Sequence, residues 1–237
     1  MIRRLSVIAL LPFVLWGCAP AAEAEETGFE TELAAAETAK AALDAKREQL
    51  AAMVEAEDEA ETEAREALAA EITADSNAFA QQIVTVINNS GMLQGEPLTE
   101  MQQRAVRLKS SEEMYVARQY IENIGNYERA IGIYEDALQL DPDNAELQAA
   151  LEQARADQFM TEERFSQAKK GMNDKQVLEL LGAARPNNIQ EFDRGGRKTV
   201  AWLYPREDGG AAGVWFENKD GKLEVYEVKF DQVPAGG

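Results

Sequence analysis

The sequence predicts an α+β protein that is mostly helical, and three observations lead to this class. Residues 29–74 are dominated by Ala, Glu, Leu, Lys and Arg, which are strong helix formers. Apolar residues then recur at helical spacing across residues 78–160, and the spacing changes to two near residue 198. We therefore expect a long N-terminal helix, a region of helical hairpins, and a small C-terminal domain of two helices and an antiparallel sheet.

Residues 1–17 have the layout of a secretory signal. Arg3 and Arg4 precede an uncharged apolar run that ends at Trp16, and the small residue Gly17 follows. The run is too short for a membrane-spanning helix, which needs roughly 20 residues. We expect this segment to be removed, and residues 18–28, rich in Ala and Glu, to form a flexible leash.

Leu15-Trp16-Gly17-Cys18 resembles the lipobox of bacterial lipoproteins. The resemblance implies that Cys18 carries fatty acids such as palmitate and becomes the mature N-terminus. Trp16 departs from the pattern, because a small residue is usual there. An ordinary secretory signal and a retained signal anchor are the alternatives. Ala19, where Asp would signal retention in the inner membrane, implies an outer-membrane lipoprotein that faces the periplasm.

The composition excludes several classes of function. The chain has 43 acidic and 24 basic residues, a net charge of −19, so it repels phosphate backbones and we expect no nucleic-acid partner. It has no histidine and a single cysteine, which removes the commonest nucleophiles, general bases and zinc ligands. We expect no enzyme activity, metal or cofactor. A hydrolase that uses a pair of carboxylates is the remaining catalytic alternative.

Residues 29–74 are predicted to form an Ala/Glu-rich helical stalk. A heptad reading places Phe29 and Leu43 on one seam, but Lys40 and Arg47 fall on that seam too. We expect a largely solvated single helix, or a weak coiled coil in its first half. We expect the stalk to serve as a spacer, with a recognition helix as the alternative, and an oligomerising stalk is one alternative function for the protein.

Residues 78–160 are predicted to form a domain of helical hairpins. Apolar stripes indicate helices over 79–88 and 98–109, Ser110 is interpreted as the start of a further helix, and residues 143–158 form the last one.

Within this domain, the stretch GNYERAIGIYEDALQLDPDN resembles the second half of a tetratricopeptide repeat, and the repeat would span residues 111–144. Asp141 before Pro142 fits the N-cap of the next helix, with proline at its first position. The first half departs from the pattern at Met114 and Arg118. The resemblance implies a partner-binding groove that suits a basic or extended segment, and its lining would be Glu112, Tyr115, Gln119, Glu122 and Asn123. Alternatively, these side chains are solvated residues on a packed helix.

Residues 161–233 form the C-terminal domain. Helices are predicted over 162–169 and 174–181, followed by strands over 189–193, 198–204, 214–216 and 223–230, with a bulge where the alternation slips at Val225 and Tyr226. Trp202, Trp215 and Phe216 cannot all lie on one face of such a sheet.

The run from residue 165 to Gly182, together with these aromatic strands, resembles the BamE (SmpA/OmlA) lipoprotein domain of outer-membrane assembly. The loop from Tyr204 to Gly210 is the domain's candidate contact loop, with a plain connection as the alternative. Its candidate partner-binding residues are Tyr204, Arg206, Glu207 and Asp208.

The sequence predicts a membrane-anchored periplasmic lipoprotein that acts as a protein-protein interaction scaffold, and the resemblance to BamE implies a role in envelope or outer-membrane protein assembly. A structural spacer and a carboxylate hydrolase are the alternatives, and the oligomeric state is left open.

Overall fold

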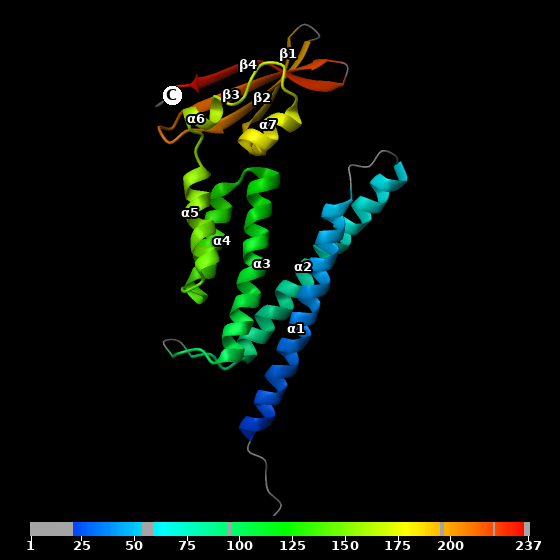
Figure 1. The fold of residues 1–237 in the computed structure, drawn as a ribbon, viewed down its shortest axis with the longest axis vertical. Coiled ribbons are helices and arrows are strands. Elements are labelled where there is room, and N and C mark those ends of the chain that lie inside the picture. The colour runs from blue at the N-terminus through cyan, green and yellow to red at the C-terminus, as the bar shows by residue number, and fades with distance from the viewer. Residues whose placement is uncertain (1–20, 54–58, 94–95, 195–196, 220, 235–237) are drawn as a thin grey trace, which may run out of the picture.

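The computed structural model describes residues 21–53, 59–93, 96–194, 197–219 and 221–234. It has a helical part followed by a smaller part in which short helices pack on a sheet, so the predicted fold class is confirmed (Figure 1). The elements are α1 (Ala21–Ala52), α2 (Glu59–Asn89), α3 (Glu100–Ile124), α4 (Tyr127–Leu140), α5 (Ala145–Asp157), α6 (Glu162–Phe165), α7 (Asp174–Leu181), the 3₁₀ helix η1 (Pro186–Asn188), β1 (Ile189–Arg194), β2 (Arg197–Pro205), β3 (Ala211–Lys219) and β4 (Lys222–Val233).

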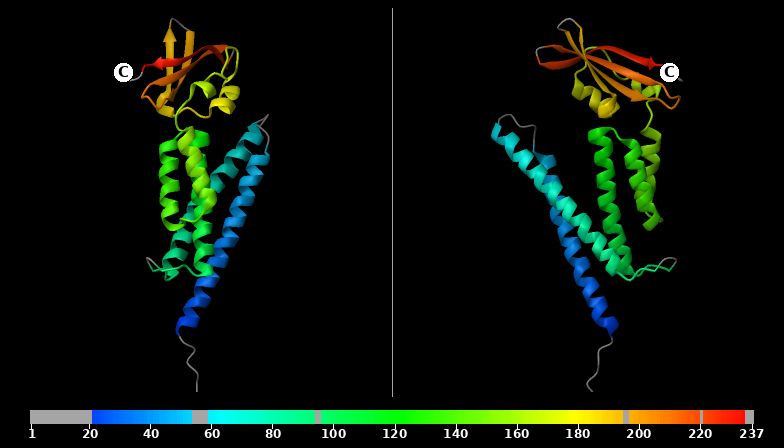
Figure 2. Two further views of the ribbon diagram at one scale, coloured as in Figure 1. Left: turned by 60° about the vertical axis from the view of Figure 1, so that its left-hand side comes forward. Right: turned by 180° about the vertical axis from the view of Figure 1, so that it is seen from behind.

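Helices α1 and α2 lie side by side as an antiparallel hairpin (Figures 1 and 2). The prediction of one solvated rod across residues 29–74 is therefore wrong. The apolar stripe of α2, which includes Phe79 and Ile83, needs a partner, and the seam of α1 with Leu33 and Leu43 supplies it. All four side chains are buried.

Several predicted boundaries differ from the observed ones. Helix α1 begins at Ala21, inside the predicted leash, and α2 continues through residue 74. Ser110 lies buried in the middle of α3, where it starts no helix. The capping box of α3 is instead formed at the N-terminal end by Thr99 and Gln102, whose side chain and backbone groups bond reciprocally.

Helices α3, α4 and α5 pack in sequence as antiparallel hairpins. Gly125, at a φ of 62°, ends α3 in the left-handed conformation, and its N–H donates to the carbonyl of Ile121. The core between the three helices includes the buried side chains of Ala117, Tyr134 and Leu147. The N-cap of α5 is Asn144, so the prediction that Asp141 caps this helix is wrong.

The sheet is an antiparallel meander in the order β1-β2-β3-β4. Helices α6 and α7 cover one face, where Phe165, Val177 and Phe216 share a core (Figures 1 and 2). The predicted bulge is confirmed, because the β3–β4 register shifts between Trp215 and Phe216, opposite Val225.

The large aromatic side chains of β2 and β3 are divided between the two faces of the sheet, as predicted. Trp202 contacts Phe216, with ring centroids 4.7 Å apart, on the helix-covered face. Trp215 contacts Phe192, 5.2 Å away, on the opposite face.

Candidate functional site

The predicted groove on α3 begins with Glu112, and the structure places this side chain in the interior. Arg47 of α1 donates two hydrogen bonds to its carboxylate, at 2.7 and 2.8 Å, and the Ser76 hydroxyl of α2 donates a third at 2.6 Å. The side chains of Arg47 and Glu112 are 8% and 5% exposed. Glu112 is therefore not available on the surface, and its carboxylate already pairs with Arg47 of the same chain.

Tyr115 contacts the same arginine. The guanidinium carbon of Arg47 lies 3.4 Å from the centroid of the Tyr115 ring, a cation–π contact. Burial by itself would lower the pKa of Arg47, but hydrogen bonds and charge attraction from Glu112 outweigh it, so the pKa is raised. Lys40 adds a second cation, 2.5 Å from Asp44 and 3.9 Å from Glu112.

The other three residues of the predicted groove lie farther along α3. Asn123 donates to the amide oxygen of Gln119 at 2.7 Å, and Gln119 donates to Glu122 at 3.3 Å. Glu122 and Asn123 are exposed. The predicted groove is thus divided into a part covered by α1 and a polar part on the surface. Cys18, the predicted lipid site, lies outside the described residues.

Tyr204, the first residue of the predicted contact loop, is a core residue. Its side chain is buried, and its hydroxyl donates to the carbonyl of Gly182 at 3.2 Å. Burial raises the pKa of Tyr204 well above its usual value. The side chain therefore joins β2 to the end of α7.

Arg206 holds the turn that follows Tyr204. Its guanidinium donates to both carboxylate oxygens of Asp208, at 3.1 and 2.5 Å, to Asp231, and to the carbonyl of Phe230 at 3.1 Å. The Arg206 hydrogen bonds, followed by the N–H of Gly210, lower the pKa of Asp208. With the Arg206 side chain 7% exposed, this arginine mainly stabilises the turn, and it also lines a hollow beside the turn.

A hollow of about 660 Å³ lies beside this turn, between the end of α5 and β4. Glu207 and Asp208 are exposed at its rim. Aromatic rings supply much of its apolar lining, and the lining includes Arg155, Ala156, Phe159, Met160 and Phe230. The structure therefore brings two of the predicted contact residues to the edge of a concave, partly aromatic surface, which is the shape that ligand sites share.

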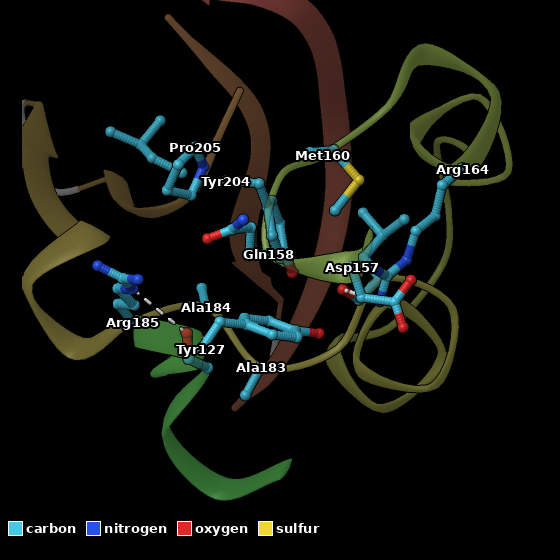
Figure 3. A pocket seen from close by; sticks show the side chains of 13 residues that line it. Tyr127, Asp157, Gln158, Met160, Arg164, Ala183, Ala184, Arg185, Tyr204 and Pro205 are labelled. Carbon is cyan, nitrogen blue, oxygen red and sulfur yellow. Dashed lines mark hydrogen bonds between the residues drawn. The ribbon is translucent and has the colours of Figure 1, made fainter. Parts of the chain in front are cut away.

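A second, much smaller cavity lies where the helical part meets the sheet part (Figure 3). Its volume is about 20 Å³, room for about one water molecule. Arg185 donates to the carbonyl of Gly125 at 3.3 Å, and Arg164 donates to the carbonyl of Leu181 at 2.8 Å. Tyr127 and Tyr204 line the same cavity. This place is a joint between the two parts, too small for an organic ligand.

Sequence reasoning missed Lys40, Arg47 and Phe159 as site residues. The signal for the first two was their position on the heptad seam of α1, where a charged side chain needs a buried partner. Phe159 offered no such signal, because it lies in the connection from α5 to α6, which is held to the sheet by the hydrogen bond from the N–H of Met160 to the carbonyl of Pro205 at 2.7 Å.

Comparisons with protein-family models, with curated proteins and with solved structures found no match. In the part of the chain that the structure describes, we find no helix with the length and apolar character needed to cross a bilayer. Among those same residues, no group of three or more His, Cys, Asp and Glu side chains is placed to hold a metal ion.

Proposed function

We propose that the chain is an outer-membrane lipoprotein that faces the periplasm and acts as a non-catalytic scaffold for protein-protein interactions. The lipobox-like sequence ending at Cys18 supports the anchor. Only two residues separate Cys18 from the first residue of α1, so lipid at Cys18 would hold the base of the α1–α2 hairpin close to the membrane. Two or three acyl chains give a lasting anchor, because each buried methylene contributes ~0.8 kcal/mol.

The observation that carries the scaffold function is the hollow beside the 204–210 turn. It combines aromatic lining with exposed Glu207 and Asp208, and Arg206 makes the turn rigid through its two ion pairs. A rigid surface loses little entropy on binding. The resemblances to a tetratricopeptide repeat and to BamE are part of this proposal. The packing of Ala117, Ala130, Tyr134 and Ala137 between antiparallel helices supports the first.

The anchor is tested by labelling cells with radioactive palmitate. We expect label in the protein, loss of label in Cys18→Ser, and release of that variant from the membrane fraction. As a control, Trp16→Ala places a small residue where lipoboxes usually have one, and we expect its processing to be at least as fast. Unlabelled protein that still fractionates with membranes would contradict the anchor.

The scaffold function is tested by in-cell crosslinking from a photoreactive amino acid at position 207. We expect a discrete crosslinked product that is lost when Phe159 is changed to Asp in the same chain. The matched control carries the photoreactive group at Glu66, which is exposed on α2, a helix that contributes no residue to the lining of the hollow. Identical products from both positions, or none from position 207, would contradict the hollow as a binding site.

The structural-spacer alternative receives no support from the fold. A spacer helix would be free along its length, whereas α1 buries Phe29, Leu33 and Leu43 against α2. Glu112 of α3 also pairs with Arg47 of α1. The hairpin is therefore packed into the helical part.

A further inference from the structure

A groove of about 740 Å³ lies between the α2–α3 connection and the α4–α5 turn. In all three views the connection passes below the ends of α4 and α5 on the same side of the molecule (Figures 1 and 2). About half of the lining is apolar, and it comes from residues far apart in the sequence, including Met92, Leu93, Leu98, Val106, Leu140 and Pro142. The volume suits several side chains of a bound segment.

Leu93 is the strongest sign that this groove binds something. It is 62% exposed, the highest value among the large hydrophobic residues of the described part of the chain. The next, Val84 on α2, is 46% exposed and lies outside the groove. A single exposed leucine needs no explanation, but a leucine at the edge of an apolar groove indicates an interaction surface.

The charged residues of the groove indicate the chemistry of the occupant. Its lining includes three carboxylates, Glu96, Asp141 and Asp143, against one cation, Arg107. Glu96 and Asp143 are exposed, and Asp141 accepts a hydrogen bond from the Asn144 amide at 2.7 Å. An occupant with positive charge is therefore favoured and an acidic one is repelled.

We propose that this groove binds a segment of a partner protein that presents apolar side chains together with Lys or Arg. The three carboxylates disfavour a fatty acid or phospholipid, whose head group is anionic or carries a phosphate. They also disfavour a second copy of this chain, which has 43 acidic residues against 24 basic ones. This inference rests on the proposed scaffold function for its meaning, and it concerns a surface separate from the hollow at the 204–210 turn.

The test measures binding of a fluorescein-labelled, eight-residue peptide of alternating leucine and lysine. The full lipidated chain is held in phosphatidylcholine nanodiscs and titrated while the anisotropy of the peptide is recorded. All variants are compared in the same nanodiscs, so uptake of peptide by lipid contributes equally. A peptide of alternating leucine and glutamate is the chemical control, and we expect it to bind at least tenfold more weakly.

Two variants should weaken binding of the leucine–lysine peptide. Leu93→Asp removes the exposed apolar edge, and we expect a loss of roughly tenfold or more. The double variant Glu96→Lys/Asp143→Lys reverses two exposed charges, and we expect a several-fold loss that grows at low salt. The matched controls are Val84→Asp and Glu152→Lys/Glu179→Lys, which make the same changes outside the groove and should leave binding unchanged.

Circular dichroism melting of every variant excludes unfolding as the cause of a loss. Equal losses of binding in the matched controls would indicate non-specific attraction and would overturn the proposal. Equal binding of the leucine–glutamate and leucine–lysine peptides would also overturn it. Unchanged binding by Leu93→Asp would also overturn it. Self-association of the chain that disappears in Leu93→Asp would assign the groove to a second copy instead. Failure here leaves the palmitate and crosslinking tests of the proposed function unaffected.

Discussion

Glu112 receives three hydrogen bonds from two helices that precede it in the chain, and its bond with Arg47 is the most buried ion pair between α1 and α3 among the described residues. Pairs of this kind contribute little compared with an apolar pair of similar size, but removing one member leaves an uncompensated buried charge. The Arg47–Glu112 pair therefore makes the position of α1 on α3 specific.

Breaking the Arg47–Glu112 pair should leave a buried charge without its main partner. We expect Arg47→Met to lower the free energy of unfolding by about 3 kcal/mol, because the buried carboxylate of Glu112 loses both hydrogen bonds from the guanidinium and its closest cation. The double variant Arg47→Met/Glu112→Leu should recover most of that loss. Urea denaturation measures both. The control is Arg104→Ala, whose partner Glu37 is on the surface, with side chains 49% and 36% exposed; its cost should stay below about 1 kcal/mol.

Tyr204 gives a prediction about pH. Because burial raises its pKa in the folded protein, the folded chain holds this proton more tightly than the unfolded chain, whose tyrosine titrates at about 10. Its contribution is fully present below about pH 10 and is lost as the pH rises further, at up to ~1.4 kcal/mol per pH unit. Urea denaturation at pH 9 to 11 should show this slope in the native chain and a smaller one in Tyr204→Phe. Equal slopes would show that Tyr204 ionises freely in the folded state.

At the scale of elements, the α1–α2 hairpin depends on the apolar stripe of α2. Phe79 is 2% exposed and packs with Leu33 and Ile83. We expect Phe79→Ala to lower the free energy of unfolding by about 3–5 kcal/mol. The cavity it leaves lies between two long helices, which can close it only by shifting against each other along their length. Val84→Ala on the same helix is the matched control, since Val84 is 46% exposed, and it should change the free energy of unfolding by less than about 0.5 kcal/mol. Similar costs for both variants would indicate a hairpin that is not packed in solution.

At the scale of the whole molecule, joint unfolding of the helical part and the sheet part depends on the contact at Gly125. A Cβ there would lie 2.1 Å from the carbonyl oxygen of Ala183, and the residue has a φ of +62°. Gly125→Ala must therefore strain the backbone, at about 1–2 kcal/mol, and also separate α3 from the end of α7. Gly91→Ala is the matched control, because Gly91 has a φ of +67° with nothing near its Cβ position. We expect Gly91→Ala to lower the free energy of unfolding by the backbone cost alone.

The measurement for the joint compares two signals during urea denaturation. In the chain without residues 1–17, the tryptophans are Trp202 and Trp215, which lie in the sheet part. Tryptophan fluorescence therefore reports unfolding of the sheet part, while far-ultraviolet circular dichroism reports mainly the helices. We expect coincident transitions in the native chain and in Gly91→Ala, and separate transitions in Gly125→Ala. Separate transitions already in the native chain would show that the two parts unfold independently.

The sequence by itself determined the fold class and most of the elements of the C-terminal part. Helix 174–181 was predicted with its observed bounds. The strands followed from alternation of apolar residues, and the slip of that alternation at Val225 and Tyr226 marked the bulge that lies opposite Trp215 and Phe216. These features depend on local propensity and on which side chains can face a common core, and both are encoded in neighbouring residues.

Only the tertiary structure decided where long elements meet. The composition of residues 29–74 is equally compatible with a free rod and with a hairpin, because a helix of Ala and Glu forms in either case. The burial of Glu112 beneath Arg47, 65 residues earlier in the chain, and the groove that brings Leu93 near Leu140 depend on contacts between distant segments. Such contacts follow from the packing of whole apolar faces, and no local pattern of residues specifies which faces meet.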